Sequence, residues 1–265
     1  MKNKKYLFKT ALFILGIVIL FPVILVGIWS ICGRWPWPNI LPEFLSLRGL
    51  REIIGSHSGA FKILISSVFI SFASAIISTI IGLMASRAFT LYEFRGKAIL
   101  QFGSMLPIIV PANVFAMGIH VIFIWWGLND NIYGVLICHI IYSLPYTISI
   151  LTDITESIGK TYEEQAYVLG CNPLKAFADI SFPLMLPAIL SSVSMAYIIS
   201  FSQYFLTLII GGGRIKTFSI IMVPFISGGD RVIASAYVIL FLFSSLIVFA
   251  LFEFAAKKIA TVLKG

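Results

Sequence analysis

Charged residues are scarce in this sequence, and their scarcity excludes an ordinary soluble protein. Only 11% of the 265 residues are Asp, Glu, Lys or Arg, whereas 59% are apolar, and the mean hydropathy is +1.01. Such a composition is typical of an integral membrane protein. The net charge of +8 does not indicate nucleic-acid binding, because the basic residues cluster at the ends of apolar runs, as membrane topology requires.

The side-chain patterns that most catalytic chemistry needs are missing too. No Gly-x-x-x-x-Gly-Lys-Ser/Thr phosphate loop occurs, and the Gly-Gly-Gly-Arg run at 211–214 is typical of a helix stop. His57, His120 and His139 are far apart and form no metal-binding pair on one helical face. The three cysteines have no paired spacing. We therefore expect no catalytic site and no metal or cofactor in this chain.

Ionisable groups inside apolar runs are nearly absent. Glu253 is the only carboxylate well inside such a run, and it lies near the end of the run beside Lys257. Secondary transporters commonly use buried ionisable groups or inverted repeats, and the sequence shows neither pattern. A carrier driven by protons thus loses support.

What the sequence does contain is six apolar segments of membrane-spanning length. We predict an all-α membrane protein with six transmembrane helices in a single domain, residues 1–265. The third and fourth spans are interrupted by Pro107, Pro111 and Pro145. The polar stretch 153–183 separates the fourth span from the fifth. The predicted spans lie near 8–32, 61–87, 98–124, 133–152, 185–210 and 232–256.

Basic residues near the span ends predict the orientation. With a cytoplasmic N-terminus, that side receives 12 of the 19 basic residues and the outer side 7. Both termini and the polar stretch are then cytoplasmic. Trp35, Trp37, Trp125 and Trp126 fall at the outer boundary, where interfacial aromatic residues belong. A short surface helix is expected in the first outer loop, near Leu47–Ile54.

Several polar residues within the spans leave two interpretations open. An amide buried in hydrocarbon without a partner costs several kcal/mol, so these groups face other helices or a pore. They could line a translocation path or hold helices together. His139 and the serines of the second span leave the same choice between packing and a path or a subunit contact. The candidate path residues are Asn113, His120, Ser202, Gln203 and Tyr204.

The polar stretch is expected to form two short helices. The first runs from Thr161 to Leu169, with Thr161 as N-cap and Glu164 completing a capping box. Gly170 suits the left-handed position that ends a helix. Asn172-Pro173 starts another turn, and a second helix from Leu174 to Ile180 ends before Pro183.

This stretch resembles the signature loop of the membrane subunits of bacterial ABC importers. The family's motif is Glu-Ala-Ala, three residues, Gly, nine residues, then Ile-x-Leu-Pro. Here Glu164-Gln165-Ala166 is followed at the same spacing by Gly170 and by Ile180-Ser181-Phe182-Pro183. Gln165 and Phe182 depart from the motif. The runs 86–89, 94–97 and 106–111 are similar to the family's link between spans two and three, so the resemblance covers roughly residues 60–256.

The resemblance implies a permease subunit that is not itself an enzyme. Two permeases, identical or homologous, enclose the path in the bacterial cytoplasmic (inner) membrane. Two cytoplasmic ATPase subunits bind the ATP and Mg²⁺, and an external binding protein delivers the solute. The loop would dock on the ATPase as a coupling helix. Glu164 would contact a basic residue of the ATPase, Ala166 would allow close packing, and Gly170 would permit the turn. The implied coupling residues are Glu163, Glu164, Gln165, Ala166, Gly170, Pro173, Ile180 and Pro183.

The solute is not readable from the spans, which show neither a carboxylate cluster for a cation nor an arginine cluster for an anion. Chain size and span pattern look most like the permeases of the polyamine and phosphonate group. Ferric-iron and thiamine permeases are similar and remain an alternative. An ATP-independent secondary transporter is a further one.

Overall fold

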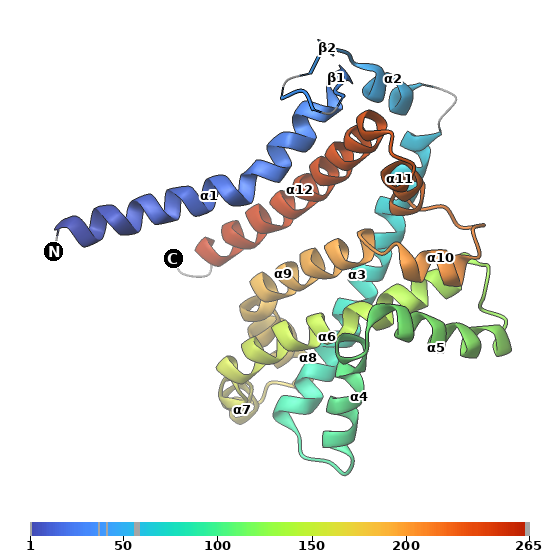
Figure 1. Cartoon of the computed structure of the whole chain (residues 1–265). Helices are drawn as coiled ribbons and strands as arrows, with labels where there is room; N and C mark the ends of the chain where they lie inside the picture. Colours follow the sequence, from blue (N-terminus) through green and yellow to red (C-terminus); the bar gives the residue numbers. More distant parts are fainter. Residues whose placement is uncertain (1, 37, 41, 56–58, 263–265) are drawn as a thin grey trace. The chain divides into compact units, whose positions relative to one another are not determined.

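The computed structural model describes residues 2–36, 38–40, 42–55 and 59–262, and Figure 1 labels its elements. Trp37, His57 and the two chain ends, about which predictions are made above, lie outside the described residues. The chain forms two compact units, residues 1–62 with 221–244 and residues 63–220 with 245–265. All candidate coupling and path residues belong to the second unit. The assignment of one domain to the whole chain stays a prediction.

The prediction of an all-α membrane protein is confirmed. Two very short strands, β1 Cys32–Arg34 and β2 Phe44–Leu45, pair antiparallel in the first unit. The predicted surface helix is present as α2, Arg48–Ile54, where Arg48 Nη2 lies 3.0 Å from Asp230 Oδ2. The other elements are α1 Lys2–Ser30, α3 Ala60–Leu91, α4 Lys97–Ile109, α5 Ala112–Trp125, α6 Ile132–Ile158, α7 Thr161–Val168, α8 Pro173–Ala176, η1 Phe177–Ser181, α9 Phe182–Phe201, α10 Phe205–Gly211, α11 Phe218–Ser227 and α12 Arg231–Val262.

The predicted third span, 98–124, is wrong as a single straight helix. It consists of α4 and α5, which meet at an angle of 116°. Val110 is extended because the ring of Pro111 disfavours a helical conformation for the preceding residue. Pro107 and Pro145, by contrast, lie inside α4 and α6 without ending them. Five described helices are long and apolar enough to span a membrane, or six spans if this bent pair counts as one.

The predicted fifth span, 185–210, also needs correction. Its apolar helical stretch runs from Pro173 to Phe201, and α10 follows as a separate helix. Between the two helices lies the polar segment Ser202–Tyr204, where the Ser202 hydroxyl donates to the Ile199 carbonyl oxygen. The predicted polar loop 153–183 is shorter than expected, because helices extend into it from both sides. Helix α6 continues to Ile158, and α8 leads through η1 directly into α9.

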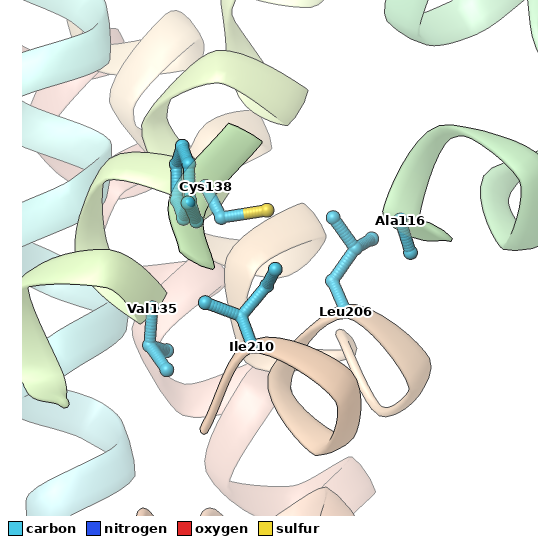
Figure 2. Close-up of a cluster of buried hydrophobic side chains, with 6 residues drawn as sticks. Ala116, Val135, Cys138, Leu206 and Ile210 are labelled. Atoms are coloured by element: carbon cyan, nitrogen blue, oxygen red, sulfur yellow. The ribbon is translucent and has the colours of Figure 1, made fainter. Parts of the chain in front are cut away.

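The core of the second unit includes a cluster between α5, α6 and α10. Figure 2 shows Leu206 and Ile210 of α10 beside Val135 and Cys138 of α6 and Ala116 of α5. Each of these side chains is buried. The cluster anchors α10 to α5 and α6, so the chain beyond the Ser202–Tyr204 break stays packed against the bundle.

The serine-rich face of α3 packs inside the chain. Ser67, Ser71, Ser74 and Ser78 are all buried. Gly82 of α3 allows close approach, because a Cβ there would lie 2.9 Å from the Cβ of Thr147 in α6. These contacts favour the packing interpretation for the four buried serines, whereas Ser66, the fifth serine of the predicted set, is exposed.

Candidate functional site

Helix α7 begins directly after α6, because Gly159 turns the chain at a φ of +64°. Lys160 precedes the helix with helical dihedral angles and makes no side-chain cap, and Thr161 is already the first helical residue. The predicted capping box of Thr161 and Glu164 is therefore wrong. Glu163 and Glu164 nonetheless lie in the first turn, where a carboxylate interacts favourably with the helix dipole.

The end of α7 follows the predicted glycine turn. Gly170 has a φ of +83°, its N–H donates to the Tyr167 carbonyl oxygen, and the Cys171 N–H donates to that of Ala166. This pair of hydrogen bonds defines a Schellman motif and satisfies two carbonyl groups at the helix end. The turn releases the chain from α7 and directs it into α8.

Replacing Gly170 with alanine is expected to destabilise this turn by about 1–2 kcal/mol, because a side chain is strained in the left-handed conformation. A Cβ there would meet no neighbouring atom, so the cost is purely conformational. Thermal unfolding of the purified permease measures it. Gly103→Ala in α4 is the control: its Cβ also enters open space and its φ is not positive. Equal melting temperatures for both variants would contradict the prediction.

The chain then continues through α8 and η1 into α9. The Asn172 side chain accepts from the Lys175 N–H, and Pro173 occupies the first helical position. The next turn, η1, is a π-helix, a geometry that often marks functional positions. The expected break before Pro183 is wrong, because η1 continues directly into α9 and Pro183 lies in the first turn of α9.

Burial divides the predicted coupling residues into two groups. Glu164, Gln165, Gly170 and Pro173 are exposed, whereas Ala166 is buried and Ile180 and Pro183 are half-buried. Glu163 is also buried, with 5% of its surface exposed. Of the two neighbouring glutamates, one is therefore buried and the other exposed, which the sequence pattern did not predict.

Glu163 lies in a polar network that joins three elements. Arg87 Nη2 of α3 lies 2.9 Å from Glu163 Oε1 and 3.0 Å from Oε2. The Ser181 hydroxyl of η1 donates to Oε1, and the Tyr167 hydroxyl donates to Oε2 at 3.3 Å. Burial by itself raises the pKa of the Glu163 carboxyl, but the hydrogen bonds from Arg87, Ser181 and Tyr167 and the charge of Arg87 outweigh it and lower the pKa below its ordinary value.

A lowered carboxyl pKa predicts how stability depends on pH. The ionised Glu163 stabilises the fold fully above the unfolded-state pKa of about 4.3, and this contribution is lost as the pH falls through the lower folded-state pKa. We expect the melting temperature of the wild type to exceed that of Glu163→Gln at neutral pH, with a difference that shrinks below about pH 4. A difference in melting temperature that stays constant between neutral pH and about pH 4 would contradict an ionised Glu163 in the network.

Four of the five predicted path residues lie at the two helix breaks, and His120 lies farther along α5. Asn113 is exposed in the first turn of α5, and His120 is on the same helix with its Nδ1 buried and unpartnered. Ser202, Gln203 and Tyr204 form the break between α9 and α10. Among the described residues, no hydrogen bond joins the two sets. The Gln203 carbonyl oxygen accepts from Thr207 and Ser219, whose hydroxyls satisfy the interrupted backbone.

His139 supports packing instead of a conduit. Its ring is buried, and its two nitrogens lie 2.8 Å from Ser200 Oγ and 2.9 Å from Thr207 Oγ1. In the part of the chain that is described, no group of three or more His, Cys, Asp or Glu side chains could hold a metal ion.

Sequence reasoning missed four residues of the Glu163 network and one groove. Arg87, Tyr167 and Ser181 contact Glu163, and Arg87 also contacts Phe177. The runs 86–89 and 180–183 carry part of the family resemblance, but nothing in them indicates a contact with Glu163. The groove has a volume of about 460 Å³ and lies between α3, α4 and α6. Its polar lining comes from Gln101, Ser104, Ser149, Thr152 and Asp153.

Several apolar helices of spanning length, with the short helices α7 and α8 between α6 and α9, define a multi-span membrane protein. Residues 78–261 match the family described as "Binding-protein-dependent transport system inner membrane component", and the chain belongs to this family. The predicted resemblance to ABC importer permeases is confirmed at this level.

Two curated relatives illustrate the range of the family. The chain is 32% identical over 143 residues to the probable sulfate transport system permease protein cysT of Helicosporidium sp. subsp. Simulium jonesii, covering 49% of this chain and 53% of the relative. It is 28% identical over 229 residues to the inner membrane ABC transporter permease protein YnjC of Escherichia coli, and this match covers 86% of this chain and 44% of the relative. The chain thus spans about half the length of these relatives. Permease proteins named for ferric iron, spermidine/putrescine and molybdate/tungstate also match.

One solved structure shares the fold. It is a chain of a bacterial ABC transporter involved in the import of the acidic polysaccharide alginate, with a TM-score of 0.65 over 94% of this chain and 95% of that one. The sequence identity is 18%, so this likeness concerns the fold alone.

Proposed function

We propose that the chain is the permease subunit of an ATP-driven importer and forms half of a solute path with a second, identical or homologous permease. The single observation that carries this proposal is the α7–α8 segment between α6 and α9, which presents apolar and acidic side chains on its surface. Val168 and Leu169 are each 88% exposed and Leu174 is 80% exposed. Large apolar side chains gathered on a polar loop are typical of a protein-binding surface.

The partner of this surface is a cytoplasmic ATPase. Glu164 adds a negative charge at the N-terminal turn of α7, complementary to a basic residue of a partner. We name the exposed set Glu164, Gln165, Val168, Leu169 and Leu174 the docking face. ATP and Mg²⁺ would bind to the ATPase, and an external protein would deliver the solute. The orientation with both termini in the cytoplasm belongs to the same proposal.

Retention of the cognate ATPase tests the proposal. The permease pair, tagged on this chain, is purified with its co-expressed ATPase, and Glu164→Arg is expected to lower the amount of ATPase retained. Glu156→Arg, at an exposed acidic position near the end of α6, is the matched control and should retain it. A wild-type chain that binds no ATPase, or that moves solute alone without ATP, would contradict the proposed function and favour a secondary transporter.

For the solute, we propose a small cationic compound of the polyamine class. The groove between α3, α4 and α6 is lined by Phe89 and Phe102 and by the carboxylate of Asp153, and no Lys or Arg lines it. Aromatic faces and a carboxylate suit an amine better than an oxyanion. This lining supports polyamine over phosphonate or sulfate, while ferric iron remains the second candidate and thiamine a third, because both are also cations.

Thermal-shift measurements on the cognate binding protein test the solute. A ligand present at 100 times its dissociation constant stabilises its protein by about 2.7 kcal/mol. We expect spermidine or putrescine to raise the melting temperature, and sulfate, aminoethylphosphonate and thiamine to leave it unchanged. Stabilisation by ferric iron alone would favour the second candidate, and stabilisation by an oxyanion would contradict the assignment to cations.

A further inference from the structure

The buried polar network of α7 has a role separate from the docking face. We propose that Arg87 and Glu163 form an internal latch that fastens α7 to α3 and η1, so that the three elements move as one body when the ATPase subunits close. This inference rests on the proposed function and assigns transmission to residues that do not touch the ATPase. Arg87 and Glu163 are therefore positioning residues.

The carboxylate of Glu163 is already bound by side chains of its own chain. Arg87 Nη2 lies within 3.0 Å of both of its oxygens, and the hydroxyls of Ser181 and Tyr167 each donate to one of them. A carboxylate with these donors, in a residue that is 95% buried, offers no accessible oxygen to a partner protein. The neighbouring Glu164 is exposed and remains the acidic group of the docking face.

Arg87 joins three elements at one point. Its guanidinium contacts Glu163 of α7 and also lies over the Phe177 ring of η1, with the guanidinium carbon 4.7 Å from the ring centroid. A planar guanidinium can bind a carboxylate and stack on an aromatic ring at the same time, which an ammonium group does less well. A second cation–π contact links the same region, because Lys160 Nζ lies 4.7 Å from the ring centroid of Tyr92. Tyr92 is the first residue after α3, and Lys160 immediately precedes α7.

The position of η1 connects the latch to helix α9. Ser181 is the last residue of η1, and α9 continues from it without a break. Helix α9 packs against α6, and α6 ends two residues before α7 begins. A force applied to the docking face therefore reaches α3 through Arg87 and α9 through Ser181. Packed helices joined by a buried charge pair shift as rigid elements.

Electrostatics favour a role in geometry over a role in bulk stability. The desolvation of a buried ion pair offsets much of its Coulomb attraction, so such pairs are weak stabilisers. Their strict geometry makes them suited to fixing the relative position of two elements. This is the property that a transmission element needs.

Distances between spin labels test the latch in the complete transporter. Labels are placed at Met84→Cys on α3 and Thr161→Cys on α7, both exposed, in a cysteine-free chain assembled with its partner permease and ATPase. We expect the wild-type separation to be narrow and identical without nucleotide and with ATP and vanadate. Glu163→Gln should broaden it and shift it in the ATP–vanadate state, whereas the control Glu156→Gln should not.

The possible results separate the two proposals. Loss of ATPase retention in the unlabelled wild-type chain contradicts the proposed function, and the inference falls with it. Normal retention together with an unchanged separation in Glu163→Gln contradicts the latch alone. If Glu163→Gln fails to accumulate, Ser181→Ala removes one donor while keeping the charge pair, and it should broaden the distribution to a smaller extent. A purely structural role predicts that Glu163→Gln lowers stability but leaves the distance between the two spin labels the same with and without nucleotide. That result would contradict the latch.

Discussion

Removing the charge of Arg87 is expected to cause the largest loss of stability in this chain. Arg87→Met leaves the Glu163 carboxylate buried with hydroxyl donors and no counter-charge, which costs about 3–5 kcal/mol when one partner of a buried ion pair is removed. The same change removes the cation–π contact with Phe177. Thermal unfolding of the purified permease measures the effect.

The double variant Arg87→Met/Glu163→Leu separates charge from packing. It leaves no unpaired charge, so we expect it to recover most of the stability lost in Arg87→Met. Arg87→Lys keeps the charge but loses the planar guanidinium, and an intermediate melting temperature is expected. Additive losses in the double variant would contradict a direct interaction between Arg87 and Glu163.

The second large effect is expected at the tip of the docking face. Leu169→Asp places a charge where we expect the ATPase to bury an apolar side chain, and loss of such a contact costs at least about 2 kcal/mol. This corresponds to a roughly 30-fold weaker affinity for the ATPase, measured by titrating purified ATPase onto the permease in nanodiscs. The melting temperature of the permease should not change, because Leu169 is 88% exposed.

A matched control lies in the other structural unit. Ile54 at the end of α2 is also a highly exposed apolar residue, on the predicted outer side. Ile54→Asp should therefore leave the affinity for the ATPase unchanged. Equal losses for Leu169→Asp and Ile54→Asp would show that the docking face had been misplaced.

The spans and the polar projection could be predicted because their causes are local. Apolar run length sets the helices, and glycine chemistry sets the turn at Gly170, whose positive φ was expected. The α4–α5 break was visible as Pro111, yet a proline inside an apolar run does not always end a helix, because Pro107 and Pro145 lie inside α4 and α6. The outcome depends on what surrounds the freed backbone groups, which the sequence does not state.

The internal part of the site could not be predicted because its contacts are distant in sequence. Arg87 and Glu163 are separated by 76 positions, and Ser181 follows Glu163 by 18. The motif spacing assigned Glu163 and Glu164 to one surface, since adjacent acidic residues on a short helix look alike. Which of them turns inward is decided by the packing of α7 against α8 and η1, a tertiary effect.

Hydrogen exchange at the α7–α8 backbone, measured on the permease in nanodiscs with and without its cognate ATPase, tests the central claim most directly. Docking is expected to slow exchange over residues 161–176, while the α2 segment 48–54 exchanges at the same rate in both samples. Unchanged exchange over 161–176 in a sample that retains the ATPase would contradict the account, because the ATPase would then bind elsewhere on the chain.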